Sequence, residues 1–187
     1  MQVAERIRKA IGNQPPTDIL LSATSVLENK PVGTLVGTLT TTDPDAGDTF
    51  TYSFTCATPG ANDSSFAIAG SNLNTAASFN FEVKNSYAIC IRTTDSGGLF
   101  FDKNFTISVT NVNESSADIA ISNSSVAENK PIGTLVGTLS TTDPDAGDTF
   151  TYSFTCAAPG VNDGSFTISG NSLKTKAVFN YEVKKSY

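Results

Sequence analysis

The sequence ENKPVGTLVGTL at residues 28–39 returns as ENKPIGTLVGTL at residues 128–139, one hundred positions later. The same offset relates TTDPDAGDTFTYSFTCA at residues 41–57 to an identical copy at residues 141–157. Aligned over 71 positions, the two copies agree at 51 of them. The chain therefore contains two copies of one unit. A period of this length is typical of a β domain repeated in tandem and is too long for a solenoid repeat.

Alternating apolar and polar residues predict short strands between turn residues in the first copy. The clearest case is residues 50–56, where Phe50, Tyr52, Phe54 and Cys56 would share one buried face. The other predicted strands cover residues 18–21, 33–41, 66–69, 73–75, 87–92 and 100–110. Seven short strands in one repeat are typical of a Greek-key β-sandwich. We therefore predict an all-β chain of tandem seven-strand sandwiches, immunoglobulin-like in architecture.

We divide the chain into a short N-terminal helix and linker at residues 1–14, repeat one at residues 15–114 and repeat two at residues 115–187. Apolar residues at helical spacing predict the helix, and the pair Pro15 and Pro16 marks the linker boundary. Repeat two ends before the positions that correspond to the last two predicted strands of repeat one. We therefore expect it to be truncated, with an exposed strand edge and half a core.

The composition excludes several functional classes. The chain has 187 residues and no His, and its 18 acidic against 12 basic residues give a net charge of -6. The absence of His removes Ser/His and Cys/His nucleophiles and His-ligated metals, and an acidic surface does not suit nucleic acid. No apolar run approaches the roughly 18 residues of a transmembrane helix. We expect no catalytic residues, no nucleic-acid partner and no membrane-spanning segment.

The three cysteines do not form an obvious disulfide framework. Cys56 and Cys156 occupy the same position in the two copies, so we interpret them as small core residues. Cys90 lies between Ile89 and Ile91, and alternation would point it outward while Cys56 points inward. We therefore expect both to be free thiols, with a disulfide between Cys56 and Cys90 as the alternative.

Acidic residues gather in the loop after the second predicted strand of each copy. Three carboxylates fall within six residues, and Pro44 and Gly47 favour a turn there. Clustered carboxylates repel one another unless a hard cation such as Ca²⁺ lies among them, although a solvated acidic turn is the alternative interpretation. The spacing is not that of an EF-hand loop. The residues are Asp43, Asp45 and Asp48, with Asp143, Asp145 and Asp148 in the second copy.

Five motifs occur together in one order. They are LENKP at 27–31, TDPD at 42–45, FNFE at 79–82, TDSGG at 94–98 and VTNVNE at 109–114. In this combination the chain resembles the cadherin repeat, in particular the bacterial cadherin-like type of large secreted or surface adhesins. The resemblance covers nearly all of the chain after residue 13.

The resemblance implies Ca²⁺ bound at the junctions between successive repeats. It assigns Glu28, Glu82, Asn111, Asn113, Glu114, Asp143 and Asp145 to the junction of repeats one and two. Asp43, Asp45 and Asp95 would serve a junction with a preceding repeat, and Glu128 and Glu182 one with a following repeat. Asn80, Asn111 and Asn180 stand where the family usually has Asp. Fewer formal charges predict weak binding, in the range of about 10⁻⁴ to 10⁻³ M found in extracellular modules.

The resemblance also implies a function and a location. The expected protein is an extracellular or cell-surface adhesin in which Ca²⁺ makes the array rigid. Its expected partners are neighbouring repeats and a homophilic or other cell-surface partner. Two alternatives are a passive spacer that does not bind calcium and a carbohydrate-binding module. A carbohydrate-binding module usually offers an exposed aromatic side chain on which a sugar stacks, and this chain has no Trp.

Overall fold

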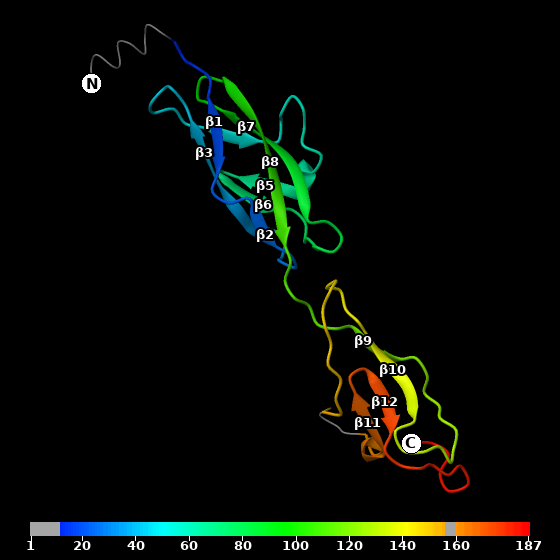
Figure 1. The fold of residues 1–187 in the computed structure, drawn as a ribbon. Coiled ribbons are helices and arrows are strands. Elements are labelled where there is room, and N and C mark those ends of the chain that lie inside the picture. Colours follow the sequence, from blue (N-terminus) through cyan, green and yellow to red (C-terminus); the bar gives the residue numbers. More distant parts are fainter. Residues whose placement is uncertain (1–11, 156–159) are drawn as a thin grey trace. The chain divides into compact units, whose positions relative to one another are not determined.

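The computed structural model describes residues 12–155 and 160–187, in two compact units that we call unit 1 (Met1–Val112) and unit 2 (Asn113–Tyr187) (Figure 1). The helix predicted near the N-terminus lies outside the described residues apart from residues 12–14, which have no regular structure. The core position predicted for Cys156 also lies outside them. Each unit is described by itself below.

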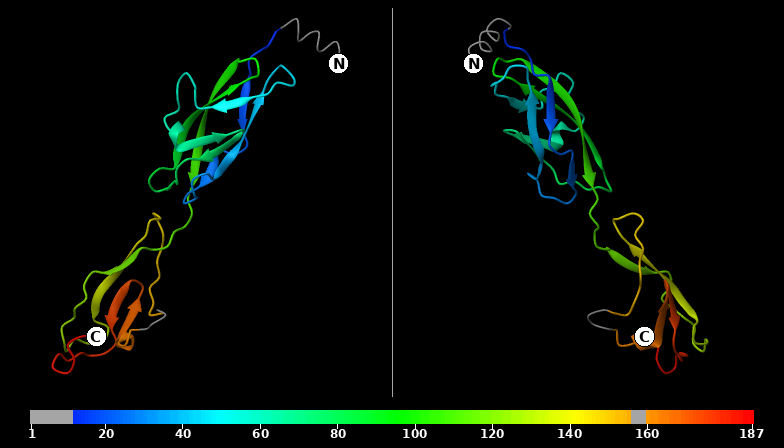
Figure 2. Two further views of the ribbon diagram at one scale, coloured as in Figure 1. Left: turned by 180° about the vertical axis from the view of Figure 1, so that it is seen from behind. Right: turned by 60° about the vertical axis from the view of Figure 1, so that its left-hand side comes forward.

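Unit 1 is a sandwich of two four-stranded sheets, which confirms the predicted all-β fold (Figure 2). One sheet has the strand order β1-β3-β6-β5 and the other the order β2-β8-β7-β4. The strands are β1 (Asp18–Leu21), β2 (Ser25–Leu27), β3 (Leu35–Thr42), β4 (Thr51–Ser53), β5 (Phe66–Ala69), β6 (Asn72–Thr75), β7 (Ser86–Thr94) and β8 (Phe100–Thr110). A 3-10 turn, η1 (Asp63–Ser65), precedes β5.

The core of unit 1 lies between these sheets. Ile19, Leu39 and Leu73 from one sheet and Ile91 and Ile107 from the other are almost completely buried. All but Ile91 lie between less buried residues along their strands, because successive side chains of a strand point to opposite faces. Burial of these branched side chains is the main force holding the sheets together, at about 1.5–3 kcal/mol for each.

The sequence did not predict β2. This strand has three residues and pairs in parallel with the end of β8, with Ser25 opposite Ser108 and Leu27 opposite Thr110. Its polar flanks and its length give no alternation to detect. Its partner lies more than eighty residues away in the sequence, so β2 is specified by tertiary contact.

The predicted strand at residues 50–56 is too long, and this error explains the wrong prediction for the cysteines. β4 ends at Ser53, so the alternation that would fix the direction of Cys56 does not extend to it. Cys56 lies in the following loop and forms a disulfide with Cys90, with 6.1 Å between their Cα atoms. Cys90 is buried like its neighbours Ile89 and Ile91, because the loop covers the outer face of β7. Its backbone N–H donates to Asp63 at 2.8 Å, which holds that loop in place.

Unit 2 contains one four-stranded sheet among its described residues, with the order β11-β12-β10-β9. Its strands are β9 (Asp118–Ile121), β10 (Leu135–Thr142), β11 (Phe166–Ser169) and β12 (Ser172–Thr175), with a 3-10 turn η2 (Asp163–Ser165) before β11. The order reproduces the β1-β3-β6-β5 sheet of unit 1 with every residue number raised by one hundred. No helix among the residues described in either unit is long and apolar enough to cross a membrane.

Candidate functional site

Acidic side chains converge at the end of unit 1 where β1 begins. Asp43, Asp48 and Asp95 each offer a carboxylate oxygen, and these oxygens lie within 4.8 Å of one another. The first two come from the loop after β3 and the third from the turn between β7 and β8. The loop is held from within, because the Asp45 backbone N–H donates to Asp43 Oδ1 at 2.7 Å. The backbone N–H of Gln14 donates to Asp45 Oδ2 at 2.7 Å and ties the incoming chain to this loop.

Asp95 is the most firmly positioned member of this group. It is 6% exposed, and its Oδ1 accepts hydrogen bonds from the backbone N–H groups of Gly97 and Leu99 at 2.8 and 2.9 Å. Asn13 Nδ2 donates to Oδ2 at 3.0 Å. Burial by itself would raise the pKa of Asp95, but these hydrogen bonds outweigh burial and hold the pKa below its usual value. The side chain is therefore a fixed anion at neutral pH.

Unit 2 has a similar acidic group, in which Asp143 and Asp148 are the repeat equivalents of Asp43 and Asp48 and Asp145 is the third member. Asp143, Asp145 and Asp148 bring one carboxylate oxygen each within 4.8 Å of the others. The Asp145 N–H donates to Asp143 Oδ1 at 3.0 Å, and the Glu114 N–H donates to Asp145 Oδ2 at 2.6 Å. The last contact repeats the bond from Gln14 to Asp45, one hundred residues on. The two loops therefore share the same backbone-to-carboxylate hydrogen bonds.

Two carboxylate oxygens in these groups lack a hydrogen-bond partner. Asp145 is 6% exposed, and its Oδ1 is buried with no partner among the described residues. Asp43 Oδ2, in the corresponding loop of unit 1, is likewise buried without a hydrogen-bond partner among the described residues. An anionic oxygen removed from water without compensation is costly, so each position favours a cation. Carboxylate oxygens in flexible loops are the ligands that Ca²⁺ prefers, and the donor set fits that ion.

Glu28 lies at the other end of unit 1, directly after β2. It is 1% exposed, and its two carboxylate oxygens accept hydrogen bonds from the backbone N–H groups of Phe81 and Val112, each at 2.8 Å. It therefore joins three segments at the end of β8. The equivalent Glu128 of unit 2 is half-buried and accepts one such bond, from the Tyr181 N–H at 2.9 Å.

The remaining predicted ligands are more exposed. Glu82, Asn111 and Asn113 are exposed and Glu114 is half-buried, while Glu182 of unit 2 is exposed in the equivalent turn. Asn80 has a local role, because its Oδ1 accepts a hydrogen bond from the Val83 N–H at 2.8 Å. An Asp could accept the same bond.

The structure brings Asp43 close to Asp95 and Asp143 close to Asp145. Their assignment as metal ligands, with Asp45, stays a prediction. The structure adds Asp48 and Asp148, which the sequence showed in the same loops but the resemblance did not assign as ligands. It also adds Asn13, which orients Asp95. No motif marks this residue, although its repeat equivalent is Asn113.

Comparisons with known proteins agree with this architecture. The family model described as a cadherin domain matches residues 22–110. The chain is 31% identical over 141 residues to the protocadherin-like wing polarity protein stan of Drosophila melanogaster, across 72% of this chain and 4% of that protein. It is 33% identical over 174 residues to human protocadherin gamma-A11, across 87% of this chain and 18% of that protein. The chain therefore spans a small part of the length of these relatives.

Solved structures share the fold. Extracellular cadherin domains 1–4 of protocadherin gamma B7 match with a TM-score of 0.59 at 26% identity, over 89% of this chain and 42% of that chain. Human protocadherin-24 EC1-2 matches with a TM-score of 0.69 at 20% identity, over 94% of this chain and 82% of that chain. The second likeness concerns the fold alone.

Proposed function

Because residues 22–110 form a cadherin repeat, we propose that this chain is a calcium-binding segment of an extracellular adhesion protein, with Ca²⁺ between successive repeats making the array rigid. The family points to an adhesion-type domain without catalytic activity. Neighbouring repeats of a longer array are the proposed immediate partners, and a homophilic or other cell-surface contact is the proposed adhesive one.

The observation that supports the proposal most strongly is the buried, unpartnered Oδ1 of Asp145 within the group that also contains Asp143 and Asp148. A solvated acidic turn would leave such an oxygen in water. We propose that Asp143 and Asp145 act together with residues at the end of repeat one. Those residues are Glu28, Glu82, Asn111, Asn113 and Glu114.

The same logic assigns the other acidic residues. Asp43, Asp45 and Asp95 would contribute ligands to a Ca²⁺ site at the junction with a preceding repeat. Glu128 and Glu182 would contribute ligands to a site at the junction with a following repeat. The residues of unit 1 support this division, because its two ligand groups lie at opposite ends of the eleven-residue strand β8.

Two residues of the proposed site, Glu28 and Glu114, have definite structural roles. Glu28 fixes the backbone at Phe81 and Val112, and so holds the last residues before the linker in one position. The Glu114 N–H, by donating to Asp145, orients one carboxylate and leaves its other oxygen available. Without a cation these carboxylates repel one another, which favours many linker conformations. Bound Ca²⁺ supplies the positive charge that removes this repulsion.

A passive spacer is the second candidate, and the Asn residues favour it. Asn111 and Asn80 each replace a charged ligand of the family pattern by a neutral one. Affinity for Ca²⁺ follows the number of charged ligands, so the proposed site is expected to be weak. The spacer predicts no response to calcium at any concentration.

Thermal unfolding of the chain in Ca²⁺, in Mg²⁺ and in chelator separates the two candidates. At a Ca²⁺ concentration ten times the dissociation constant, linkage predicts about 1.4 kcal/mol of stabilisation. We expect a rise in melting temperature that is specific for Ca²⁺ and is lost in the variant Asp143→Ala with Asp145→Ala. Asp118→Asn is the matched control, because it removes an exposed carboxylate outside the group. Identical melting curves in all three buffers would support the passive spacer.

A second measurement addresses rigidity. Fluorescent labels on unit 1 and unit 2 report the distribution of the distance between them by single-molecule energy transfer. We expect Ca²⁺ to narrow this distribution and the double Asp variant to keep it broad. A calcium-induced rise in melting temperature with no narrowing would leave calcium binding supported and would reject its role in rigidity.

A further inference from the structure

Four Asn residues of the chain stand in the motif Asn-x-Ser/Thr, which accepts N-linked glycans in secreted proteins. They are Asn62, Asn104, Asn113 and Asn123. We propose that Asn104 is an N-glycan acceptor and that the other three are not. The proposal rests on the extracellular location in the proposed function and does not depend on calcium. The disulfide between Cys56 and Cys90 supports that location, because such bonds persist in oxidising compartments.

The motif at Asn104 lies on the outer face of the long strand β8. Asn104 and Thr106 are both exposed, because residues two apart on a strand point to the same side. Neither side chain forms a hydrogen bond within the described residues. Across the strand pair they lie opposite Cys90 and Ala88, whose side chains are small. The amide nitrogen of Asn104 is therefore open to solvent and has no contact to lose.

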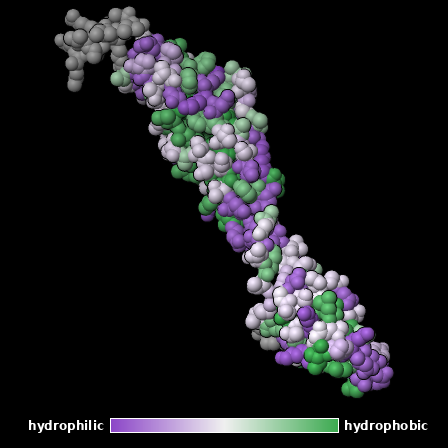
Figure 3. Space-filling model, viewed as in Figure 1, coloured by the Kyte–Doolittle hydropathy of each residue, from purple (hydrophilic) through white to green (hydrophobic). Residues whose placement is uncertain are grey.

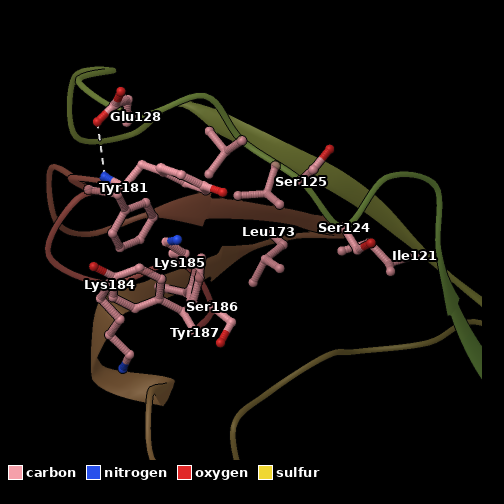
Figure 4. A pocket seen from close by; sticks show the side chains of 14 residues that line it. Ile121, Ser124, Ser125, Glu128, Leu173, Tyr181, Lys184, Lys185, Ser186 and Tyr187 are labelled. Carbon is pink, nitrogen blue, oxygen red and sulfur yellow. Dashed lines mark hydrogen bonds between the residues drawn. The ribbon is translucent and has the colours of Figure 1, made fainter.

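Asn123, in contrast, uses its amide fully. Its Nδ2 donates to the carbonyl oxygens of Ser125 and Val136 at 2.6 and 2.7 Å. Its Oδ1 accepts a hydrogen bond from the Ser125 hydroxyl at 3.1 Å, so the third residue of the motif is engaged as well. Figure 4 shows Ser124 and Ser125 in the wall of a largely apolar cavity of unit 2. A glycan on Asn123 would replace one N–H and break one of these hydrogen bonds.

The side chains of Asn62 and Asn113 are engaged too. Asn62 is half-buried beside β7, where its backbone N–H donates to the Ala88 carbonyl at 2.9 Å and its Oδ1 accepts from the Ala88 N–H at 3.0 Å. Nδ2 of Asn113 donates to the Glu114 carbonyl at 3.1 Å. A bulky glycan on either residue would disturb a contact of the folded chain.

The attachment is a transfer of an oligosaccharide from a polyprenyl diphosphate. Nδ2 of Asn104 bonds to C1 of the first sugar, and the bond between C1 and the diphosphate oxygen breaks. The amide nitrogen gives up one proton, and the polyprenyl diphosphate leaves. Because this transfer can precede folding, the structure selects among the four acceptors through the chains that fold and are secreted.

The test maps glycans on the full chain, secreted from cultured animal cells behind an added signal peptide. Peptide N-glycosidase in heavy-oxygen water converts each glycosylated Asn to an Asp that carries the heavy isotope, which mass spectrometry locates. We expect the labelled fraction of the secreted protein to be higher at Asn104 than at each other acceptor by about tenfold, because a lost hydrogen bond disfavours the folded chain.

Variants of the motif test the assignment directly. Asn104→Gln and Thr106→Ala should abolish the label at residue 104, whereas Thr106→Ser should keep it, because the hydroxyl remains. Ser108→Ala is the matched control, since it removes the next exposed hydroxyl of β8, which lies outside the motif. After enzymatic removal of glycans, all four variants should melt as the wild type does, because these side chains point to solvent.

The proposal is overturned by secreted protein without a label at Asn104, by equal labelled fractions at the four acceptors, or by a label that persists in Thr106→Ala. The calcium measurements are separate. A melting temperature that rises specifically with Ca²⁺, in protein without the label, would reject the glycan alone. A label at Asn104 together with identical melting curves in Ca²⁺ and chelator would reject calcium binding alone.

Discussion

Residues 141–157 repeat residues 41–57 without a single change, yet the two segments differ in structure. In unit 1 the segment Thr51–Ser53 is the strand β4, and it pairs with β7 from Thr94 to Arg92. In unit 2 the identical residues 151–153 are not a strand. Since local sequence is the same, local propensity cannot be the cause. The strand forms where a partner strand is present, as expected for an element held by cross-strand contacts.

The same contrast holds for the core. Ile19 is fully buried in unit 1, whereas the equivalent Ile119 is 62% exposed in unit 2. Both residues occupy the same position in a strand, and both strands pair with their neighbours in the same register. The sheet of unit 2 therefore forms its hydrogen bonds while burying fewer apolar side chains, among them Val136 and Phe179. Figure 3 shows hydrophobic residues among the polar ones on the visible surface of unit 2.

The most direct test of this difference in burial is to truncate the two isoleucines. Ile19→Ala should destabilise unit 1 by about 2–5 kcal/mol, because it removes a fully buried side chain and leaves a cavity. Ile119→Ala should change the stability of unit 2 by no more than about 0.5 kcal/mol, because most of that side chain is in water. Urea unfolding, with each unit followed by its own hydrogen-exchange peptides, measures both. Equal effects would show that the burial pattern of unit 2 is wrong.

Reduction of the disulfide should give the next largest difference. The bond between Cys56 and Cys90 closes a loop over a separation of 34 residues, so its loss should cost unit 1 about 2–4 kcal/mol. The variant Cys56→Ala with Cys90→Ala should behave as the reduced protein does. Unit 2 should not respond to either change. Unfolding in the presence and absence of reductant tests this, and an insensitive unit 1 would contradict it.

Glu28 and Glu128 provide a third test. Glu28→Ala leaves the backbone N–H groups of Phe81 and Val112 without their acceptor and should cost unit 1 about 1–3 kcal/mol. Glu128→Ala removes one such bond from a half-buried residue and should cost less. Chelator is present in both measurements, so that no bound cation contributes. Glu28→Gln is the control, because its amide oxygen keeps one acceptor. A larger loss in unit 2 would reject this role of Glu28.

The smallest expected effect is a pH dependence restricted to unit 1. Arg92 donates to both oxygens of Asp102, at 2.7 and 2.9 Å, and this ion pair lowers the pKa of Asp102. A lowered pKa means that the stabilisation is complete above the pKa of an unfolded Asp, about 3.9, and is lost as the pH falls through the folded value. The pair is partly exposed, so the loss should be at most about 1 kcal/mol.

The variant Asp102→Asn isolates the contribution of this ion pair to the stability of unit 1. The difference in unfolding free energy between the wild type and the variant should be largest near pH 7 and should shrink toward zero below pH 3. An unchanged difference across this range would show that the carboxylate charge does not matter. Unit 2 is the internal control, because Arg92 and Asp102 both belong to unit 1.

The sequence predicted those parts of the fold that repeat or alternate. The strands β1, β5 and β8 have the bounds expected from alternation and turn residues, and the predicted sandwich is the observed fold. The sequence failed where tertiary contact decides, as at β2. The prediction for Cys56 was also wrong, because β4 ends at Ser53 and the alternation of side chains along the strand does not extend to Cys56.

The candidate site shows the same division. The groups around Asp43 and Asp143 could be predicted, because each is made chiefly by one loop with a recognisable motif. The contribution of Asn13 could not, because its contact with Asp95 joins residues 82 positions apart and depends on where the incoming chain lies. Burial of one oxygen of Asp145 is a property of packing and leaves no trace in the sequence.

The parallel pairing of β2 with β8 has a consequence for how unit 1 bears force. In Figure 1 the chain enters unit 1 at one end and leaves it at the other, along β8. A pull on the two ends would draw β2 and β8 past each other in opposite directions. Their hydrogen bonds would then be sheared together instead of opening one after another. The paired segments Ser25–Leu27 and Ser108–Thr110 would thus resist extension as a mechanical clamp.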